Sequence, residues 1–201
     1  MTESAAAGST RIDILWIPLG AGAHAARVSG RIFEGAAAAL GGRPRRDLYH
    51  SALQVHMPEG VYVIEQTPVP ASGYPAQRGV VATGAVGLRW AARLRVFRYE
   101  IRRWLGGVIP DAADAVAGPR PISEIPADVR RVLPAVPSVP TPVWGRDELD
   151  TGEMWNSNSV IAWTLSRGGV DLTDVRPPAG GRAPGWRAGL VVAARQGGAL
   201  R

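Results

Sequence analysis

The alternation of apolar and polar side chains is strongest on either side of the segment MPEG, residues 57–60. Apolar residues recur there at every second position, which is typical of two half-buried strands. Pro58 suits the first central position of a tight turn, and Gly60 suits its last position. The pattern therefore predicts an antiparallel hairpin over residues 48–67.

The turn also sets the pairing register of this hairpin. With residues 56 and 61 paired, His50 faces Thr67 and lies diagonally from Glu65, about 7 to 8 Å away. A carboxylate at that position can hold an imidazole in one tautomer and support its protonated form. The alternative is a solvated polar face, made of His50, Gln54 and Glu65. We expect the apolar face to consist of Leu53, Val55, Tyr62 and Ile64.

Other segments have the periodicity of helices or of further strands. The strongest helix is expected at residues 158–169, where the apolar run VIAWTL ends in a Gly-Gly pair. Ile161 and Leu165 should join the apolar face of the hairpin in one core, and Trp163 should lie buried against the sheet. The remaining elements are expected as strands at 12–20 and 95–104 and as helices at 30–42, 126–133 and 185–196.

These elements predict an α+β fold in which an antiparallel sheet packs against the helix at residues 158–169. The chain has 201 residues, of which 46% are hydrophobic, so it can bury one sizeable core. We therefore expect a single domain over residues 1–201. A proline-rich segment, 110–142, should cover this domain, and a tail rich in Gly, Pro and Arg follows at 176–201.

The net charge of +6 is compatible with a nucleic acid or an anionic surface as partner. All 23 basic residues are Arg, which is also typical of the amino-acid bias of a high-GC bacterial genome. The densest cluster is RLRVFRYEIRRW, residues 93–104. Its period of two predicts a strand whose Arg stems lie along a half-exposed sheet, and a nucleic-acid groove is the less favoured alternative.

Several classes of chemistry are excluded or disfavoured. The chain has no Cys, which excludes disulfides, thiolate metal sites and a cysteine nucleophile. The dinucleotide-like pattern GAGAHA, residues 20–25, lacks an acidic residue about 20 positions later. The acidic residues of segment 147–153 lack the spacing of a known cation loop. We therefore expect no cofactor and no metal. His24 and His56 are interpreted as surface or packing residues.

The termini and the apolar runs bear on localisation. The amino-terminal segment carries acidic residues and lacks the pattern of a secretory signal. No apolar run approaches the roughly 20 residues that cross a bilayer. We expect a cytoplasmic protein without a membrane span, and the sequence leaves its oligomeric state open.

The segment MWNSNSVIAW, residues 154–163, is the main candidate site. Ser157 stands at or just before the amino terminus of the strongest predicted helix, where unpaired backbone N–H groups can stabilise an oxyanion. Asn and Ser are also the preferred helix-capping residues. Ser157 is therefore either a nucleophile or part of a cap.

The order of YHSALQV, GVYVIE and NSNSVIAWTL resembles the circularly permuted papain-like hydrolases, which include the NlpC-related, PPPDE and lecithin retinol acyltransferase families. The resemblance covers roughly residues 48–168 and implies a papain-like permuted fold, with His50 as base, Glu65 as its orienting partner and Ser157 in the place of the nucleophilic Cys. Family members with this layout use a thiol, and this chain has none.

The resemblance also implies what the site would act on. The substrate would be a small molecule, peptide or acyl compound with an amide, ester or thioester bond. Trp155 is expected to wall the cleft, and Asn156 and Asn158 to contact the substrate. Two alternatives remain open: an inactive binding protein on the same fold, and an Arg-mediated binder of nucleic acid or of an anionic surface.

Overall fold

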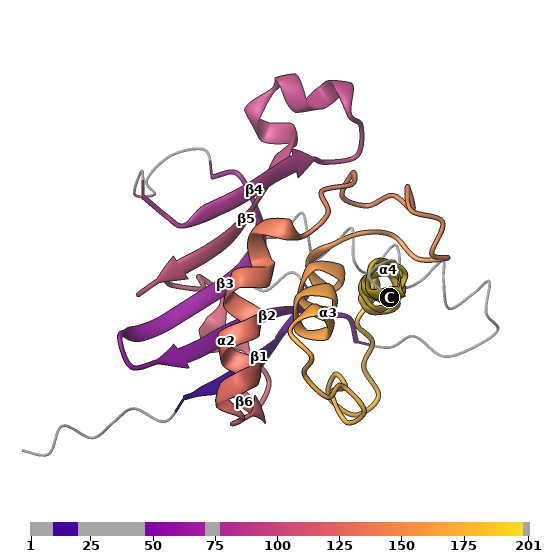
Figure 1. Cartoon of the computed structure of the whole chain (residues 1–201). Helices are drawn as coiled ribbons and strands as arrows, with labels where there is room; N and C mark the ends of the chain where they lie inside the picture. The colour runs from indigo at the N-terminus through magenta and orange to yellow at the C-terminus, as the bar shows by residue number, and fades with distance from the viewer. Residues whose placement is uncertain (1–9, 20–46, 71–76, 199–201) are drawn as a thin grey trace, which may run out of the picture.

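Six strands of the described residues form one antiparallel sheet. The computed structural model describes residues 10–19, 47–70 and 77–198. The strand order is β4-β5-β3-β2-β1-β6, and every neighbouring pair is antiparallel (Figure 1). The strands are β1 Arg11–Pro18, β2 Tyr49–Met57, β3 Gly60–Pro68, β4 Val80–Ala85, β5 Arg98–Leu105 and β6 Arg120–Ser123.

The predicted hairpin is confirmed together with its register. Strands β2 and β3 pair with His56 opposite Val61 and with Leu53 opposite Ile64. Because side chains alternate along a strand, this register places Leu53 and Ile64 on the same face of the sheet. The turn residue Gly60 has a φ of 139°, a conformation that favours glycine.

The edges of the sheet differ from the prediction. The expected strand at 95–104 begins only at Arg98, because Arg95–Phe97 forms a short 3-10 helix, η2. Strand β4 was not predicted, since it lies in a glycine-rich connection. Strand β6 lies within the proline-rich segment and was missed as well, although an edge strand tolerates a residue such as Pro121. The helix expected at 30–42 and the pattern at 20–25 lie outside the described residues.

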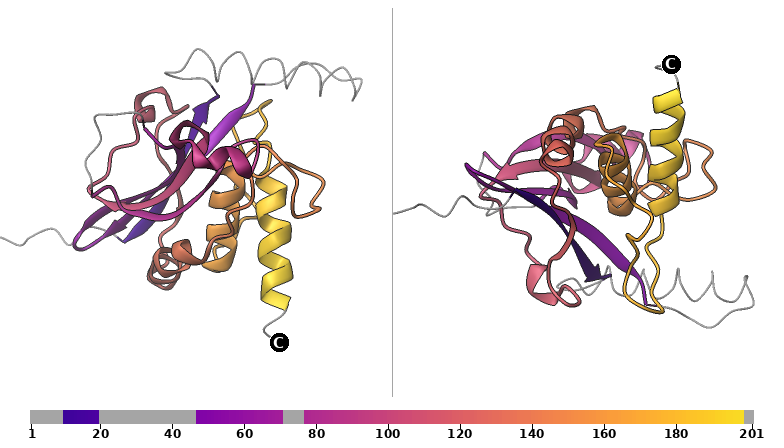
Figure 2. Two further views of the ribbon diagram at one scale, coloured as in Figure 1. Left: turned by 90° about the horizontal axis from the view of Figure 1, so that it is seen from above. Right: turned by 60° about the horizontal axis from the view of Figure 1, so that its bottom comes forward.

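The α-helices of the described residues lie on one face of the sheet: α2 Pro126–Ala135, α3 Ser157–Arg167 and α4 Trp186–Gly198. All three match predicted helices. Figure 2 shows α3 next to the sheet and α4 on the outer side of α3. The two helices approach closely at Gly189, where a Cβ atom would collide with the backbone oxygen of Ser159. None of the described helices has the length and apolarity needed to cross a membrane.

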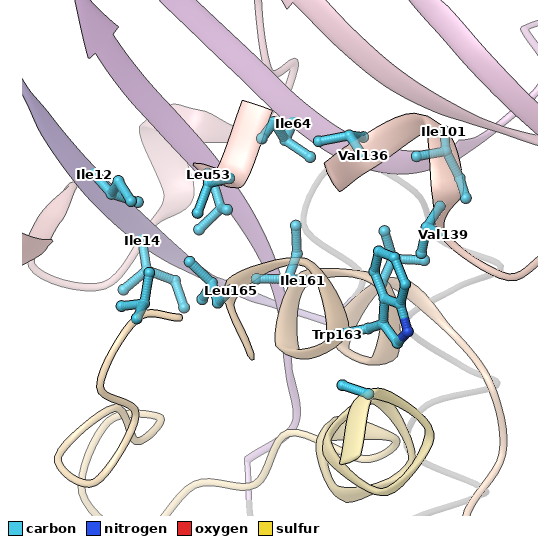
Figure 3. Close-up of a cluster of buried hydrophobic side chains, with 14 of the residues drawn as sticks. Ile12, Ile14, Leu53, Ile64, Ile101, Val136, Val139, Ile161, Trp163 and Leu165 are labelled. Carbon is cyan, nitrogen blue, oxygen red and sulfur yellow. The ribbon is translucent and has the colours of Figure 1, made fainter. Parts of the chain in front are cut away.

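The main core lies between the sheet and these helices (Figure 3). Leu53 and Ile64 from the hairpin contribute to the same buried cluster as Ile161 and Leu165 from α3, as predicted. Trp163 is 2% exposed and also belongs to it, which confirms its expected burial. The structure is therefore an α+β fold with a six-stranded antiparallel sheet and three helices.

The opposite face of the sheet, which we call the second face, carries a smaller apolar cluster. Strands β1, β2 and β3 contribute to it, and the segment around the 3-10 helix η3 (Ala112–Asp114) packs against it. The members of this cluster are Leu15, Ile17, Ala52, Val63 and Ile109.

Candidate functional site

The amino terminus of α3 is closed by a complete capping box. Asn156 is the N-cap, and its Oδ1 accepts hydrogen bonds from the backbone N–H groups of Asn158 (2.9 Å) and Ser159 (3.4 Å). The hydroxyl of Ser159 accepts in return from the backbone N–H of Asn156 at 3.1 Å. Two of the N–H groups that would form an oxyanion hole are therefore already bonded within the protein.

Asn158 joins α3 to strand β2. Its Nδ2 donates to the backbone oxygens of Tyr49 and Pro184, each at 2.9 Å, and its Oδ1 accepts from the hydroxyl of Ser51 at 2.9 Å. Asn158 is 1% exposed, so these hydrogen bonds are shielded from water. The side chain expected to contact substrate is instead fully engaged in holding the fold together.

The turn before α4 completes the same polar contact region. The hydroxyl of Ser159 donates to the backbone oxygen of Gly185 at 2.7 Å, and the Gly185 N–H donates to Glu153 at 3.0 Å. Gly185 has a φ of 83°, and a Cβ atom there would lie 2.6 Å from Oδ1 of Asn156. Only glycine fits this position, because both the backbone conformation and the space exclude a side chain.

Ser157 occupies the first position of α3 and is 5% exposed. Among the described residues its hydroxyl has no hydrogen-bond partner. Asn156, and not Ser157, is the cap. Among the residues that the structure describes, no base therefore lies within hydrogen-bonding distance of the Ser157 hydroxyl.

His50 lies on the opposite side of the sheet from Ser157. Ser51 points toward α3, since its hydroxyl bonds Asn158, and side chains alternate along β2. His50 therefore points to the second face, as does Ala52, and it pairs with Ile17 of the second-face cluster. The expected arrangement of Ser157 and His50 as nucleophile and base is corrected by this geometry, because the sheet lies between them.

His50 and Glu65 share the second face, as the register predicted, but Glu65 has a different partner. Its Oε1 accepts from Nη1 of Arg102 at 2.8 Å, and Arg102 also donates through Nε to Glu100 at 2.6 Å. Arg78 donates to both carboxylate oxygens of Glu100, through Nε to Oε1 at 2.6 Å and through Nη2 to Oε2 at 2.7 Å. Glu65 thus belongs to a buried row of alternating charges, and no hydrogen bond to His50 is present in the part of the chain that the structure describes.

Burial shifts the pKa values of His50 and Glu65 in opposite directions. It lowers the pKa of His50 to about 4, so the imidazole is neutral at pH 7. It raises the pKa of Glu65, with Arg102 opposing the change. A neutral imidazole could act as a base, but its position leaves it without the hydroxyl of Ser157 as a reactant.

A side-chain contact between His56 and Asp13 was missed by the sequence analysis. Nε2 of His56 lies 2.8 Å from Oδ2 of Asp13, which is 1% exposed and also accepts from Arg11 at 3.0 Å. The two partners are 43 positions apart in the chain, so local spacing carried no signal of the pair. His56 is thus more than the surface or packing residue that we expected.

Trp155 does not wall an open cleft. It is 2% exposed and belongs to the main core, and its indole N–H has no hydrogen-bond partner in the described parts of the chain. The side-chain amide of Gln66 is also buried and unpartnered there. The unpartnered atoms of both side chains are shielded from water in the described parts of the chain, so a ligand cannot contact them there.

The acidic segment before α3 has a structural role. Asp147 accepts from the backbone N–H groups of Thr151 and Gly152, each at 2.8 Å. These bonds contribute to the lowered pKa of Asp147. Within residues 10–19, 47–70 and 77–198, no three His, Cys, Asp or Glu side chains are grouped as metal ligands.

A different surface feature connects β4 to β5. Residues 86–98, which we call the arginine–aromatic protrusion, contain the 3-10 helices η1 (Trp90–Arg93) and η2, and project from the top of the molecule in Figure 1. The protrusion has no acidic residue. Its exposed side chains are Leu88, Arg89, Trp90, Arg93, Leu94, Arg95, Val96, Phe97 and Arg98.

The arginines of the protrusion differ in their pairing. Arg89 forms a two-point contact with Glu148 at 2.9 and 2.7 Å, and Arg98 donates to the backbone oxygen of Ala92 at 2.6 Å. Arg93 and Arg95 have no ion pair with any described residue. The positive charges of Arg93, Arg95 and Arg98 are therefore not neutralised by a carboxylate of the described structure.

Compared with protein-family models, curated proteins and solved structures, the chain gives no match.

Proposed function

We propose that the chain is a non-catalytic binding protein that attaches to phosphate-bearing anionic surfaces through the arginine–aromatic protrusion. The observation that carries the proposal is the exposure of Arg93 and Arg95, without an ion pair among the described residues, in a segment that contains no acid. Guanidinium groups bind phosphate oxygens through charge-assisted, two-point hydrogen bonds. Unpaired arginines on a projecting segment are accessible to such a ligand.

The separation of Ser157 from His50 supports the non-catalytic part of the proposal. The resemblance to permuted papain-like hydrolases stays a prediction, and it rests on the order of short motifs along the chain. Serine needs an adjacent base to act as a nucleophile, and His50, the base that the resemblance implies, lies on the other side of the sheet. Of the functions considered from the sequence, binding to an anionic surface is the one that the described geometry supports best.

The binding part is tested by affinity for heparin as a function of salt. Neutralising Arg93 and Arg95 together, as Arg93→Gln and Arg95→Gln, should weaken binding and make the slope of log affinity against log salt shallower by about 2. The matched control neutralises Arg130 of α2 and Arg187 of α4, two exposed arginines outside the protrusion. If both double variants change the slope equally, net charge and not the protrusion governs binding.

The non-catalytic part is tested with the single cysteine of a Ser157→Cys variant. Its reaction with iodoacetamide should not depend on His50, so the rate should be the same in a Ser157→Cys, His50→Ala double variant. A fluorophosphonate probe should not label the wild-type protein at Ser157. Fast alkylation at pH 6 that slows when His50 is removed would instead establish a nucleophile–base pair.

A further inference from the structure

The arginine–aromatic protrusion combines its charge with unusually exposed apolar side chains. Trp90 is 70% exposed, Leu94 58% and Val96 73%. Single exposed apolar residues are common on protein surfaces, but a group of them on one projecting segment marks an interaction site. Phe97 and Leu88 of the same segment are exposed as well. The partner must therefore accept apolar side chains as well as arginines.

The apolar side chains distinguish between two kinds of anionic partner. Nucleic acid offers phosphates for Arg93 and Arg95 and bases for stacking on Trp90, but no hydrocarbon for Leu94 and Val96. The interface of an anionic bilayer offers phosphates and, a few ångströms deeper, acyl chains. Tryptophan is favoured at that depth, and arginine can extend its charged end back to the headgroups.

Hydrogen bonds attach the base of the protrusion to the body of the protein. Arg89 is fixed by Glu148, and Arg146 donates to the backbone oxygen of Gly87. The backbone N–H of Gly87 donates to the oxygen of Trp144 at 3.0 Å. The base of the protrusion is thus anchored, and ordering it on a surface costs less conformational entropy than ordering a free loop.

We infer that the protrusion inserts Trp90, Leu94 and Val96 into the interface of an anionic phospholipid bilayer, while Arg93 and Arg95 contact lipid phosphates. The inference rests on the proposed function, because it names the partner of the same surface. It requires no helix that spans the membrane, since the contact is confined to one leaflet.

Sedimentation with sucrose-loaded vesicles tests the lipid as partner. The protein should bind vesicles of equimolar phosphatidylcholine and phosphatidylglycerol and should not bind vesicles of phosphatidylcholine alone. Replacing Leu94 and Val96 by Ser should weaken vesicle binding at least tenfold, because the two changes remove five carbon atoms beyond Cβ and the loss of only about two of them from the hydrocarbon already corresponds to that factor. Heparin affinity should stay unchanged in the same variant.

A matched control comes from apolar residues of similar exposure elsewhere. Val108 is 66% exposed and follows the far end of β5, and Ile125 is 58% exposed and precedes α2. Replacing both by Ser should leave vesicle binding unchanged. An equal loss in the two double variants would overturn the inference, because apolar surface in general would then govern binding.

Insertion itself is measured with an environment-sensitive fluorophore. Because the chain contains no Cys, a Leu94→Cys variant carries one labelling site, and Ile125→Cys carries the control label. The label at position 94 should shift to shorter emission wavelength on anionic vesicles, and the label at position 125 should not.

The outcomes separate the inference from the proposed function. Heparin binding without vesicle binding, or vesicle binding without a spectral shift at position 94, overturns the inference and leaves the anionic-surface function standing. Tight binding to single-stranded DNA together with no binding to vesicles identifies nucleic acid as the partner instead. If the wild-type protein binds neither heparin nor anionic vesicles, the proposed function and the inference are both overturned.

Discussion

Replacing Asn158 by Ala tests whether the polar residues before and within α3 hold the fold or bind a ligand. The change removes the donor to the oxygen of Tyr49 and the acceptor for Ser51. The pairing of β2 with β3 ends at Leu53 and Ile64, so β3 does not reach Tyr49. The side chain of Asn158 therefore supplies to the backbone oxygen of Tyr49 the donor that a neighbouring strand would otherwise provide. The oxygen of Pro184 also loses a donor but keeps one from Asn156.

The magnitude follows from the number of groups left unpaired. Each buried hydrogen bond contributes a net of about 0.5 to 1.5 kcal/mol, and orphaned buried groups add to the loss. We therefore expect Asn158→Ala to lower the free energy of unfolding by about 3 kcal/mol. For a chain of this length, that corresponds to a fall in Tm of roughly 6 to 12 °C.

The assay is thermal and urea unfolding followed by circular dichroism, with Ser157→Ala as the control. The neighbouring hydroxyl of Ser157 has no partner among the described residues, so its removal should change the free energy of unfolding by no more than about 0.5 kcal/mol. If Asn158→Ala unfolds at the same temperature as the wild type, Asn158 does not stabilise the fold, and a contact between Asn158 and a substrate becomes the better explanation. Equal losses in both variants would also refute the reasoning.

Three other substitutions test the core and the second face. Trp163→Ala removes a buried side chain whose indole N–H donates to Gln196 at 2.7 Å. Urea unfolding should show a free energy of unfolding that is lower by roughly 3 to 5 kcal/mol, and an unchanged transition would contradict the packing of Trp163 in the core. Gln66→Met removes a buried amide without a partner among the described residues and should raise stability by about 1 to 2 kcal/mol; a loss would indicate that this amide is hydrogen-bonded. Burial lowers the pKa of His50 from 6.5 to about 4. Between these two pH values the unfolded chain binds a proton at His50 that the folded chain does not bind, so the free energy of unfolding should fall as the pH decreases from 6.5 to about 4. His50→Gln should abolish that contribution, which is at most about 3 kcal/mol, and an unaltered pH dependence would show that His50 is not buried in the neutral form.

Local patterns in the sequence were sufficient to predict the hairpin, its register and the three described helices. The MPEG turn relates β2 to β3 over a few residues, so strand pairing follows from turn geometry and alternation. The helix α3 is marked by its capping residues and by apolar spacing, both of which are local as well. Strands β4 and β6 were missed, because they are short edge strands, stabilised by a neighbouring strand more than by their own composition.

The separation of His50 from Ser157 already followed from the local patterns, although the order of the motifs along the chain indicated a pair. The hairpin register already put Leu53 and His50 on opposite faces, and α3 was expected on the Leu53 face, so His50 could not also reach Ser157. The family resemblance follows motif order along the chain, and motif order does not say which side of a sheet a residue faces.

Contacts between residues distant in the chain were decided only by the tertiary structure. Strand β1 brings Asp13 to His56, and β5 brings Arg102 to Glu65. Turns and helix caps form between neighbours in sequence, so their residues are visible in a short segment. A buried charge finds its partner across strands whose order depends on the packing of the whole sheet, and for that reason only the folded chain determines the pairs.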